Sequence, residues 1–240
     1  MFLDNYCSSS NNEIRFTREQ ASAFAKDIAD DFNPLHDIDA KRFCVPGDLL
    51  FSLILAKCGL HQDMSFTFSG MVTEESVLNF PNEINGEAQV IDAKDKEYMQ
   101  VAAKGEQTNN EQVIESLIRS YVEFSGHTFP DMLMKLMQEQ GVMINPARPM
   151  IMYESMSIHL DTLAVDEVKL VVSQNTLEVD GKRGKACLMF DLVSDGKVIG
   201  NGKKHMVLSG LREYCQEAVN KIVESYHQKK ADYSNQAIAS

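Results

Sequence analysis

The chain has 240 residues, a formal net charge of −12 and 44% hydrophobic residues. These near-average apolar and charged shares exclude disordered and collagen-like classes, and the length allows one large domain or two small ones. Phosphate backbones repel so acidic a chain, and its longest basic run covers only residues 181–185, so no nucleic-acid partner is expected.

Apolar stretches and cysteines indicate a cytoplasmic protein. The longest apolar stretch, residues 49–60, is interrupted by Ser52 and Lys57 and falls short of the ~20 residues that span a bilayer. The first residues lack the basic segment and apolar core of a signal peptide. The five cysteines are scattered and never form a CxxC pair, which is typical of reduced thiols. The histidines also lack the spacing of a metal site, so we expect no metal. From the short apolar stretch we expect no membrane span.

The first half predicts helices followed by strands. Thr17 and Gln20 form a capping box, and the apolar spacing after them predicts a helix over residues 17–29. Asn33-Pro34 then makes residues 31–36 irregular. Pro46 and an early carboxylate open a second helix, which is apolar on nearly all sides and therefore buried. Strands are predicted at residues 64–72, 77–80, 88–92 and 97–104.

The second half repeats this order with variations. Residues 111–124 predict an amphipathic helix, and residues 129–137 resemble residues 45–53 in their opening proline, early carboxylate and buried apolar run. Strands are predicted at residues 150–160, 169–179, 185–193 and 197–208, with a closing helix at 211–230. The expected class is α+β, a helix with a long antiparallel sheet that occurs twice.

Asp31 and His36 are the first candidates for chemistry. They lie five residues apart across Asn33-Pro34. A regular helix would separate their side chains by about 140°, whereas a bent chain can bring them to one point. A carboxylate and an imidazole can remove one proton and deliver another near neutral pH. Taken alone, such a pair is more often an ordinary turn with an exposed histidine.

Residues 28–55 resemble the MaoC-like dehydratase family, also called the (R)-specific enoyl-CoA hydratase family. Its signature is Gly-Asp-x-Asn-Pro-hydrophobic-His, followed by a glycine-containing turn and the central helix of a hot-dog fold. The matching positions are Asp31, Asn33, Pro34 and His36, with Phe43 at the aromatic before the turn and Gly47 at the turn glycine. The whole chain also resembles an uncharacterised bacterial family that carries this motif.

The resemblance implies a double hot-dog fold. The first repeat, residues 1–108, carries the motif, and the second, residues 109–240, is a degenerate copy that ends in a helix. The implied activity is that of a hydratase or dehydratase, a lyase of fatty-acid metabolism that acts on a 2-enoyl or 3-hydroxyacyl thioester. Coenzyme A or the phosphopantetheine of an acyl carrier protein would enter as part of the substrate, with no separate cofactor. A fused pair can stand alone or pair again as a homodimer.

The resemblance also implies roles for single residues. Asp31 and His36 would hold and activate a water, and Asn33 would order the hook or that water. The N–H of Gly47, at the positive end of the buried helix, would contact the oxyanion. The residues expected to bind substrate are Phe32, Phe43 and Asp48.

The chain departs from the family pattern in three ways. Asp30 replaces the glycine before the catalytic aspartate, which either raises one carboxyl pKa or turns one side chain outward. Pro46 replaces the histidine of the turn after a shortened spacer, and because proline has no N–H, a second oxyanion donor must come from elsewhere. The second half has no matching motif, since its nearest segment, residues 124–127, has a histidine but no carboxylate at the required spacing.

Two other functions remain open. The fold can serve as a non-catalytic module that binds acyl-CoA or an acyl carrier protein. It can also serve as a thioesterase in which Asp48 activates water at the thioester carbon. Weaker candidates are Cys44 as a nucleophile and the basic residues at 182–185 and 203–204 as phosphate ligands, because such residues are ordinarily buried core and solvated surface, respectively.

Overall fold

The computed structural model describes residues 2–10 and 12–239, with side chains as far as residue 235. The first half contains η1 (Phe2–Asn5), β1 (Ser8–Ser10), β2 (Glu13–Arg15), α1 (Arg18–Ala23), η2 (Phe24–Ile28), η3 (Pro34–His36), α2 (Gly47–Cys58), β3 (Leu60–Phe68), β4 (Val77–Asn79), β5 (Glu87–Asp92) and β6 (Glu97–Thr108). The second half contains α3 (Glu111–Gly126), η4 (Thr128–Met132), α4 (Leu133–Glu139), β7 (Val142–Met143), β8 (Ile151–Leu160), β9 (Lys169–Asp180), β10 (Arg183–Ser194), β11 (Lys197–Ser209), β12 (Arg212–Glu213) and α5 (Gln216–Ala239).

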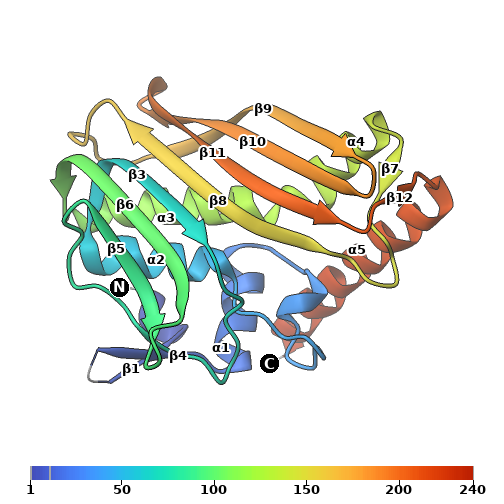
Figure 1. Cartoon of the computed structure of the whole chain (residues 1–240), viewed down its shortest axis with the longest axis horizontal. Coiled ribbons are helices and arrows are strands. Elements are labelled where there is room, and N and C mark those ends of the chain that lie inside the picture. The colour runs from blue at the N-terminus through green and yellow to red at the C-terminus, as the bar shows by residue number, and fades with distance from the viewer. Residues whose placement is uncertain (1, 11, 240) are drawn as a thin grey trace.

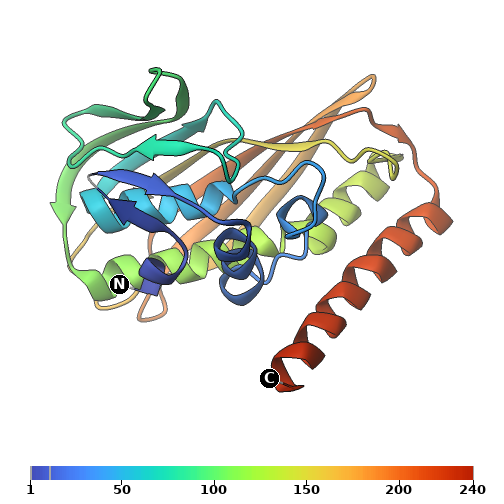
Figure 2. The ribbon, with the colours of Figure 1, turned by 90° about the horizontal axis from the view of Figure 1, so that it is seen from below.

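One antiparallel sheet joins the two halves. Its ten strands follow the order β1-β2-β4-β5-β6-β3-β8-β11-β10-β9, so the halves meet where β3 pairs with β8. Helices α2 and α3 lie against one face of this sheet, whereas α5 extends away from it (Figures 1 and 2). The chain therefore has the α+β, double hot-dog fold that the sequence predicts. Each predicted strand is present, although the first lies four residues nearer the N-terminus than expected.

Helix α2 is the buried helix of the first half. It begins at Gly47 after the N-cap residue Pro46, and residues 48–55 are all buried. The ring of Phe51 packs against Phe66 of β3 and Tyr121 of α3, with centroid distances of 5.0 Å and 4.7 Å. Because α2 is enclosed by the sheet on one side and α3 on the other, its sequence is apolar on nearly all sides.

The second half differs from its predicted repeat. The buried helix there is α3, whose Tyr121 is fully buried, and not the apolar run at residues 129–137. That run is divided, because Phe129 has extended backbone angles (φ −120°, ψ 132°) before Pro130. A residue that precedes proline is disfavoured in the helical region, so only the short helix α4 follows.

Two further properties concern the described part of the chain. None of its helices combines the length and the apolarity that a membrane crossing requires. Among the same residues, no group of three or more His, Cys, Asp or Glu side chains is arranged to hold a metal ion.

Candidate active site

Residues 30–36 form a hook between η2 and α2. Within it, Oδ2 of Asp31 lies 3.7 Å from Nε2 of His36. The N–H of Asn33 donates to Oδ1 of Asp31 at 2.8 Å, and the N–H of Leu35 donates to Oδ1 of Asn33 at 3.1 Å. The side chain of Asn33 thus orders the hook, and the bend brings the aspartate and the histidine together.

The hydrogen bonds of His36 define which of its nitrogens carries the proton. Its Nδ1 lies 2.7 Å from the carbonyl oxygen of Cys44. A carbonyl only accepts, so Nδ1 carries a proton and donates; in a neutral ring Nε2 then faces Asp31 as an acceptor, and in a protonated ring it donates to Asp31. Burial raises the pKa of Asp31, and the neighbouring His36 lowers it in part. With the ring neutral, Oδ2 of Asp31 and Nε2 of His36 are two acceptors to which one bridging water could donate.

Asp30 turns away from this pair, which is one of the two outcomes expected from neighbouring carboxylates. Its φ of +54° lies in the left-handed region, where glycine is favoured. Its carboxylate accepts a hydrogen bond from Lys230 and lies 3.5 Å from Nε2 of His127. The hydroxyl of Tyr226 donates to the carbonyl oxygen of Asp30 at 3.2 Å and accepts from the N–H of Phe32 at 3.1 Å. Helix α5 therefore holds the backbone of the hook.

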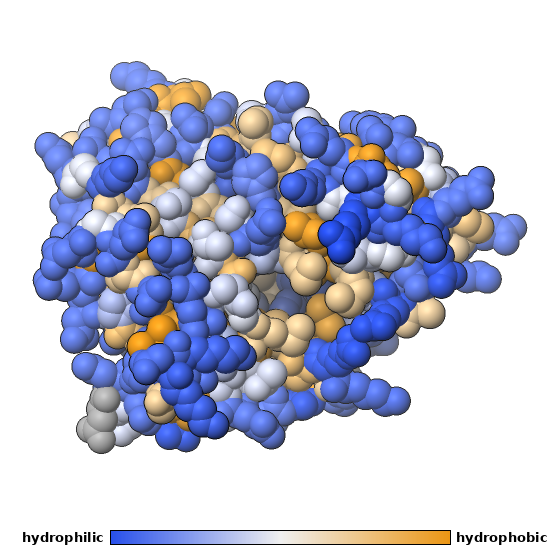
Figure 3. Space-filling view, viewed as in Figure 1, coloured by the Kyte–Doolittle hydropathy of each residue, from blue (hydrophilic) through white to orange (hydrophobic). Residues whose placement is uncertain are grey.

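Asp31 and His36 line a cavity of about 150 Å³. Gly47 and Asp48, from the first turn of α2, line it as well. The first N–H groups of a helix have no carbonyl partner within that helix, so the N–H of Gly47 is available to a ligand. Figure 3 shows this face of the molecule hollowed near its middle, with apolar residues around the opening.

A buried charge pair lines the same cavity. Lys204 of β11 donates a hydrogen bond to Oγ of Ser125, and Ser125 donates to Oδ2 of Asp48 at 2.5 Å. The ammonium of Lys204 lies 4.2 Å from the centroid of the Tyr153 ring. Burial lowers the pKa of Lys204, while the carboxylates of Asp48 and Asp31 oppose that change. Lys204 is thus linked through Ser125 to Asp48, and it lies near enough to Asp31 for the two charges to interact.

Two buried oxygens of this cavity have no hydrogen-bond partner among the described residues. They are Oδ1 of Asp48 and Oγ1 of Thr128, whose residues are 9% and 4% exposed. Buried polar atoms in native proteins are nearly always hydrogen-bonded. The cavity therefore offers polar groups that a polar ligand or water can satisfy.

The residues expected to bind substrate lie in three different places. Asp48 lines the cavity, and Phe32 lines an apolar cavity beside it. Phe43 is buried in the core with the guanidinium of Arg18 over its ring, and it lines neither cavity. The expected contact between Phe43 and substrate therefore finds no support in its position.

The structure gives Gly47 a packing role that the sequence did not indicate. A Cβ at this position would lie 3.1 Å from the ring of Tyr153 and 3.2 Å from that of Phe68. These two rings pack together with centroids 4.2 Å apart and planes tilted by 33°. A side chain at this position would press on both rings, so the glycine allows the aromatic pair to approach the start of α2 closely.

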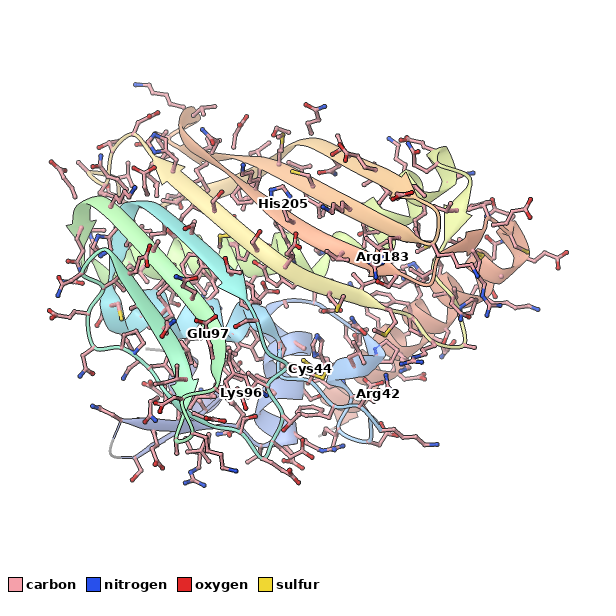
Figure 4. The ribbon with its side chains drawn as sticks, viewed as in Figure 1. Arg42, Cys44, Lys96, Glu97, Arg183 and His205 are labelled. Atoms are coloured by element: carbon pink, nitrogen blue, oxygen red, sulfur yellow. The ribbon has the colours of Figure 1, made fainter. Side chains whose placement is uncertain are left out.

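Cys44 lies on the loop between η3 and α2 (Figure 4) and also lines the cavity. Its thiol donates to the carbonyl oxygen of Val45 at 3.3 Å, and burial raises its pKa to about 11. A thiol with so high a pKa is protonated at neutral pH and is a poor nucleophile. This environment does not support a catalytic role for Cys44.

Ser125 was not expected in the site, and Lys204 was considered only as a weak phosphate ligand or solvated surface, whereas it is buried at 4% exposure. A signal for Lys204 exists in the sequence, because β11 alternates and places Gly202, Lys204 and Met206 on the buried face. The neighbouring His205 lies on the face of the sheet opposite the helices (Figure 4). A lysine at an inward-facing strand position is unusual and marks a paired or functional charge.

The chain matches one family model and is similar to several solved structures. A family model described as "Protein of unknown function (DUF3581)" matches residues 1–217. The search of curated proteins found no match. Among solved structures, a conserved protein of unknown function with a hot dog fold from Alicyclobacillus acidocaldarius is 8% identical, with a TM-score of 0.47, and the match covers 87% of this chain and 98% of that one.

Two other similar structures are named as thioesterases. The acyl-CoA thioesterase II TesB2 from Mycobacterium marinum is 7% identical, with a TM-score of 0.41 and coverage of 90% of this chain and 99% of that one. An acyl-ACP thioesterase from Bacteroides thetaiotaomicron is 9% identical, with a TM-score of 0.32 and coverage of 68% and 90%. At such identities and TM-scores these names describe the neighbours and assign no reaction to this chain.

Proposed function

The chain belongs to the family described as protein of unknown function (DUF3581), and from the geometry of its own cavity we propose that it adds an activated water to an acyl thioester. The observation that carries this proposal is the pair of acceptors, Oδ2 of Asp31 and Nε2 of His36, 3.7 Å apart. A water between them donates a hydrogen bond to each and loses a proton to one of them. Such positioned acid–base groups typically contribute about 10²–10⁴ in rate.

Two groups of the cavity supply oxyanion contacts in this proposal. The N–H of Gly47 lies at the positive end of α2 and points its dipole toward developing negative charge. Pro46 has no N–H, and the ammonium of Lys204 takes the place of the second donor on the thioester oxygen. Loss of one oxyanion donor typically costs about 10²–10³ in rate.

Hydration of a 2-enoyl thioester is the finer reaction that the Asp31–His36 geometry favours. Water forms a bond to the β-carbon, the double bond becomes an enolate, and the pair delivers a proton to the α-carbon. Elimination of water from a 3-hydroxyacyl thioester is the same path in reverse. The pair supports this reaction because the member that takes a proton from the water can then return a proton to the α-carbon.

Hydrolysis of the thioester is the second candidate. Here water attacks the carbonyl carbon, the bond to sulfur breaks and the thiol leaves with a proton. Two observations favour it: Oδ1 of Asp48 is unpartnered in the cavity, and the similar structures carry thioesterase names. A carboxylate at that position can act as general base for the attacking water.

One assay separates these reactions. Purified full-length protein is given crotonyl-CoA and longer trans-2-enoyl-CoAs while the enoyl-thioester absorbance and free thiol are followed together. Loss of absorbance without thiol indicates hydration, and equimolar thiol indicates hydrolysis. His36→Ala is expected to abolish hydration and Asp48→Asn to abolish hydrolysis, whereas His159→Ala, which removes an exposed histidine paired with Asp63 and Asp161, should leave both unchanged. No turnover at any chain length contradicts the proposal and favours the binding module, which calorimetry with the same thioesters then tests.

A further inference from the structure

A second, larger cavity lies beside the candidate active site. Its volume is about 360 Å³, within the ~300–1,000 Å³ range of small-molecule sites. Its walls come from the hook, the segment before β8 and helix α5, which contributes Ile222 and Tyr226. Most of the lining side chains are apolar, among them Phe32, Leu35 and Ile151.

The two cavities share part of their lining. Asn33, Leu35, Phe129 and Ile151 border both the larger cavity and the one that holds Asp31 and His36. A ligand whose reactive carbonyl lies at the acid–base pair therefore has an apolar space adjacent to that carbonyl. This space is bounded by α5, which lies outside the sheet and the two helices that the sheet encloses (Figure 2).

We propose that this cavity binds the aliphatic acyl chain of the thioester, so that α5 determines the chain length that the protein accepts. The proposal rests on the proposed function for the identity of the reacting group. The pantetheine arm is a poorer occupant, because its amides need hydrogen bonds that a mostly apolar lining does not offer. Lys221 and Lys229 at the edge of the cavity belong to α5 as well, and Lys229 pairs with Asp37 of the first half.

The chain offers a substitution that fills the cavity and a matched control. Ile222→Trp places a large ring in the cavity from a half-buried position of α5. Gln228→Trp adds the same side chain at an exposed position of the same helix, where only an exposed hydrogen bond to Asp232 is lost. Ile222→Ala enlarges the cavity and provides a second test that does not require a bulky side chain to be accommodated.

The first measurement is binding of cis-parinaric acid, a long-chain fatty acid that fluoresces in apolar surroundings, and it does not depend on turnover. We expect the wild-type chain and Gln228→Trp to bind it equally, and Ile222→Trp to bind at least about tenfold more weakly. Absence of binding to the wild-type chain, or equal binding by Ile222→Trp, overturns the proposal.

The second measurement is turnover against chain length. Ile222→Trp is expected to lower kcat/KM for trans-2-octenoyl-CoA at least about tenfold while changing that for crotonyl-CoA less than about twofold, and Ile222→Ala to shift the preference toward longer chains. Equal losses on both substrates, or an unchanged preference in Ile222→Ala, overturn the proposal while the proposed function stands. If no thioester is turned over but parinaric acid binding depends on residue 222, the aliphatic-chain site stands and the proposed function fails.

Discussion

Asp31 lies in a cavity where burial raises its pKa. When the folded-state pKa of a group exceeds its unfolded-state value, its contribution to stability is fully present below the unfolded value, which is ~3.9 for Asp, and is lost as the pH rises through the folded value. Asp31→Asn keeps an oxygen for the N–H of Asn33 but cannot ionise. We expect the Tm above that pH window to rise (~2–4 °C for each kcal/mol) while turnover falls about 10²–10⁴-fold. Thermal unfolding between pH 5 and 8 and the enoyl-CoA assay measure the two effects.

Asp30→Asn is the matched control for this substitution. Asp30 is the adjacent carboxylate, but it points toward Lys230, and asparagine tolerates its left-handed backbone. Asparagine keeps an oxygen that can accept from Lys230, and loss of the charge from a partly exposed pair changes stability by only ~0–1 kcal/mol, so both turnover and Tm should stay near their wild-type values. Equal gains in Tm for the two variants, or full turnover in Asp31→Asn, would contradict the role of Asp31.

At the scale of elements, the chain of hydrogen bonds from Lys204 through Ser125 to Asp48 joins β11, α3 and α2. Breaking a buried ion pair by removal of one partner leaves an uncompensated charge and costs about 3–5 kcal/mol. We therefore expect Lys204→Met to lower the free energy of unfolding by about that amount, and Lys204→Met with Asp48→Asn to lower it by less. Urea unfolding of the two single variants and the double variant measures the coupling. Additive losses would show that the two charges do not interact.

Gly126, at the end of α3, lies against the end of η2. A Cβ there would lie 1.7 Å from the carbonyl oxygen of Ala29, so Gly126→Ala must displace backbone. The expected loss of stability is about 3 kcal/mol or more, at the upper end of overpacking effects. Gly181→Ala has a φ of +55° but open space around its Cβ, so it should cost only about 1 kcal/mol of conformational strain. Urea unfolding compares the two variants, and similar losses for both would contradict the steric explanation.

Local patterns explain what could be predicted about the elements. The capping box at Thr17 is present because its bonds join residues three apart, and the strands appear because alternation depends on neighbouring residues alone. The resemblance of residues 129–137 to residues 45–53 holds only in part, because the chain is broken before Pro130 and the helix α4 begins only at Leu133. Phe43 was assigned to substrate by its sequence position, whereas its burial under Arg18 depends on packing between elements.

The membership of the site could be predicted only in part for the same reason. Asp31, Asn33 and His36 belong to one short segment, so their convergence follows from local bends. Ser125 and Lys204 reach the cavity from α3 and β11, and only the tertiary fold brings those elements together. Alternation along β11 could have placed Lys204 on the buried face, but it could not have named the carboxylates that it faces.

At the scale of the whole molecule, helix α5 near the C-terminus contacts segments near the N-terminus. In Figure 1 helix α5, drawn in red, lies beside the blue N-terminal segments. Lys229 pairs with Asp37 and Lys230 with Asp30. These two ion pairs and the hydrogen bonds of Tyr226 join α5 to the hook and to the residue that follows it. The orientation of the hook therefore depends on a helix that is remote from it in sequence.

Tyr226→Phe tests this dependence. It keeps the ring that packs on Phe32 but removes the hydroxyl, which leaves the buried N–H of Phe32 without its partner at a cost of about 1–3 kcal/mol. Because the hook positions the acid–base pair, we expect kcat to fall about tenfold or more while KM changes much less. Tyr233→Phe is the control, since its hydroxyl also belongs to α5 but donates to Asp27 outside the hook. If both variants lose kcat equally, or if Tyr226→Phe changes only stability, then α5 does not position the catalytic pair.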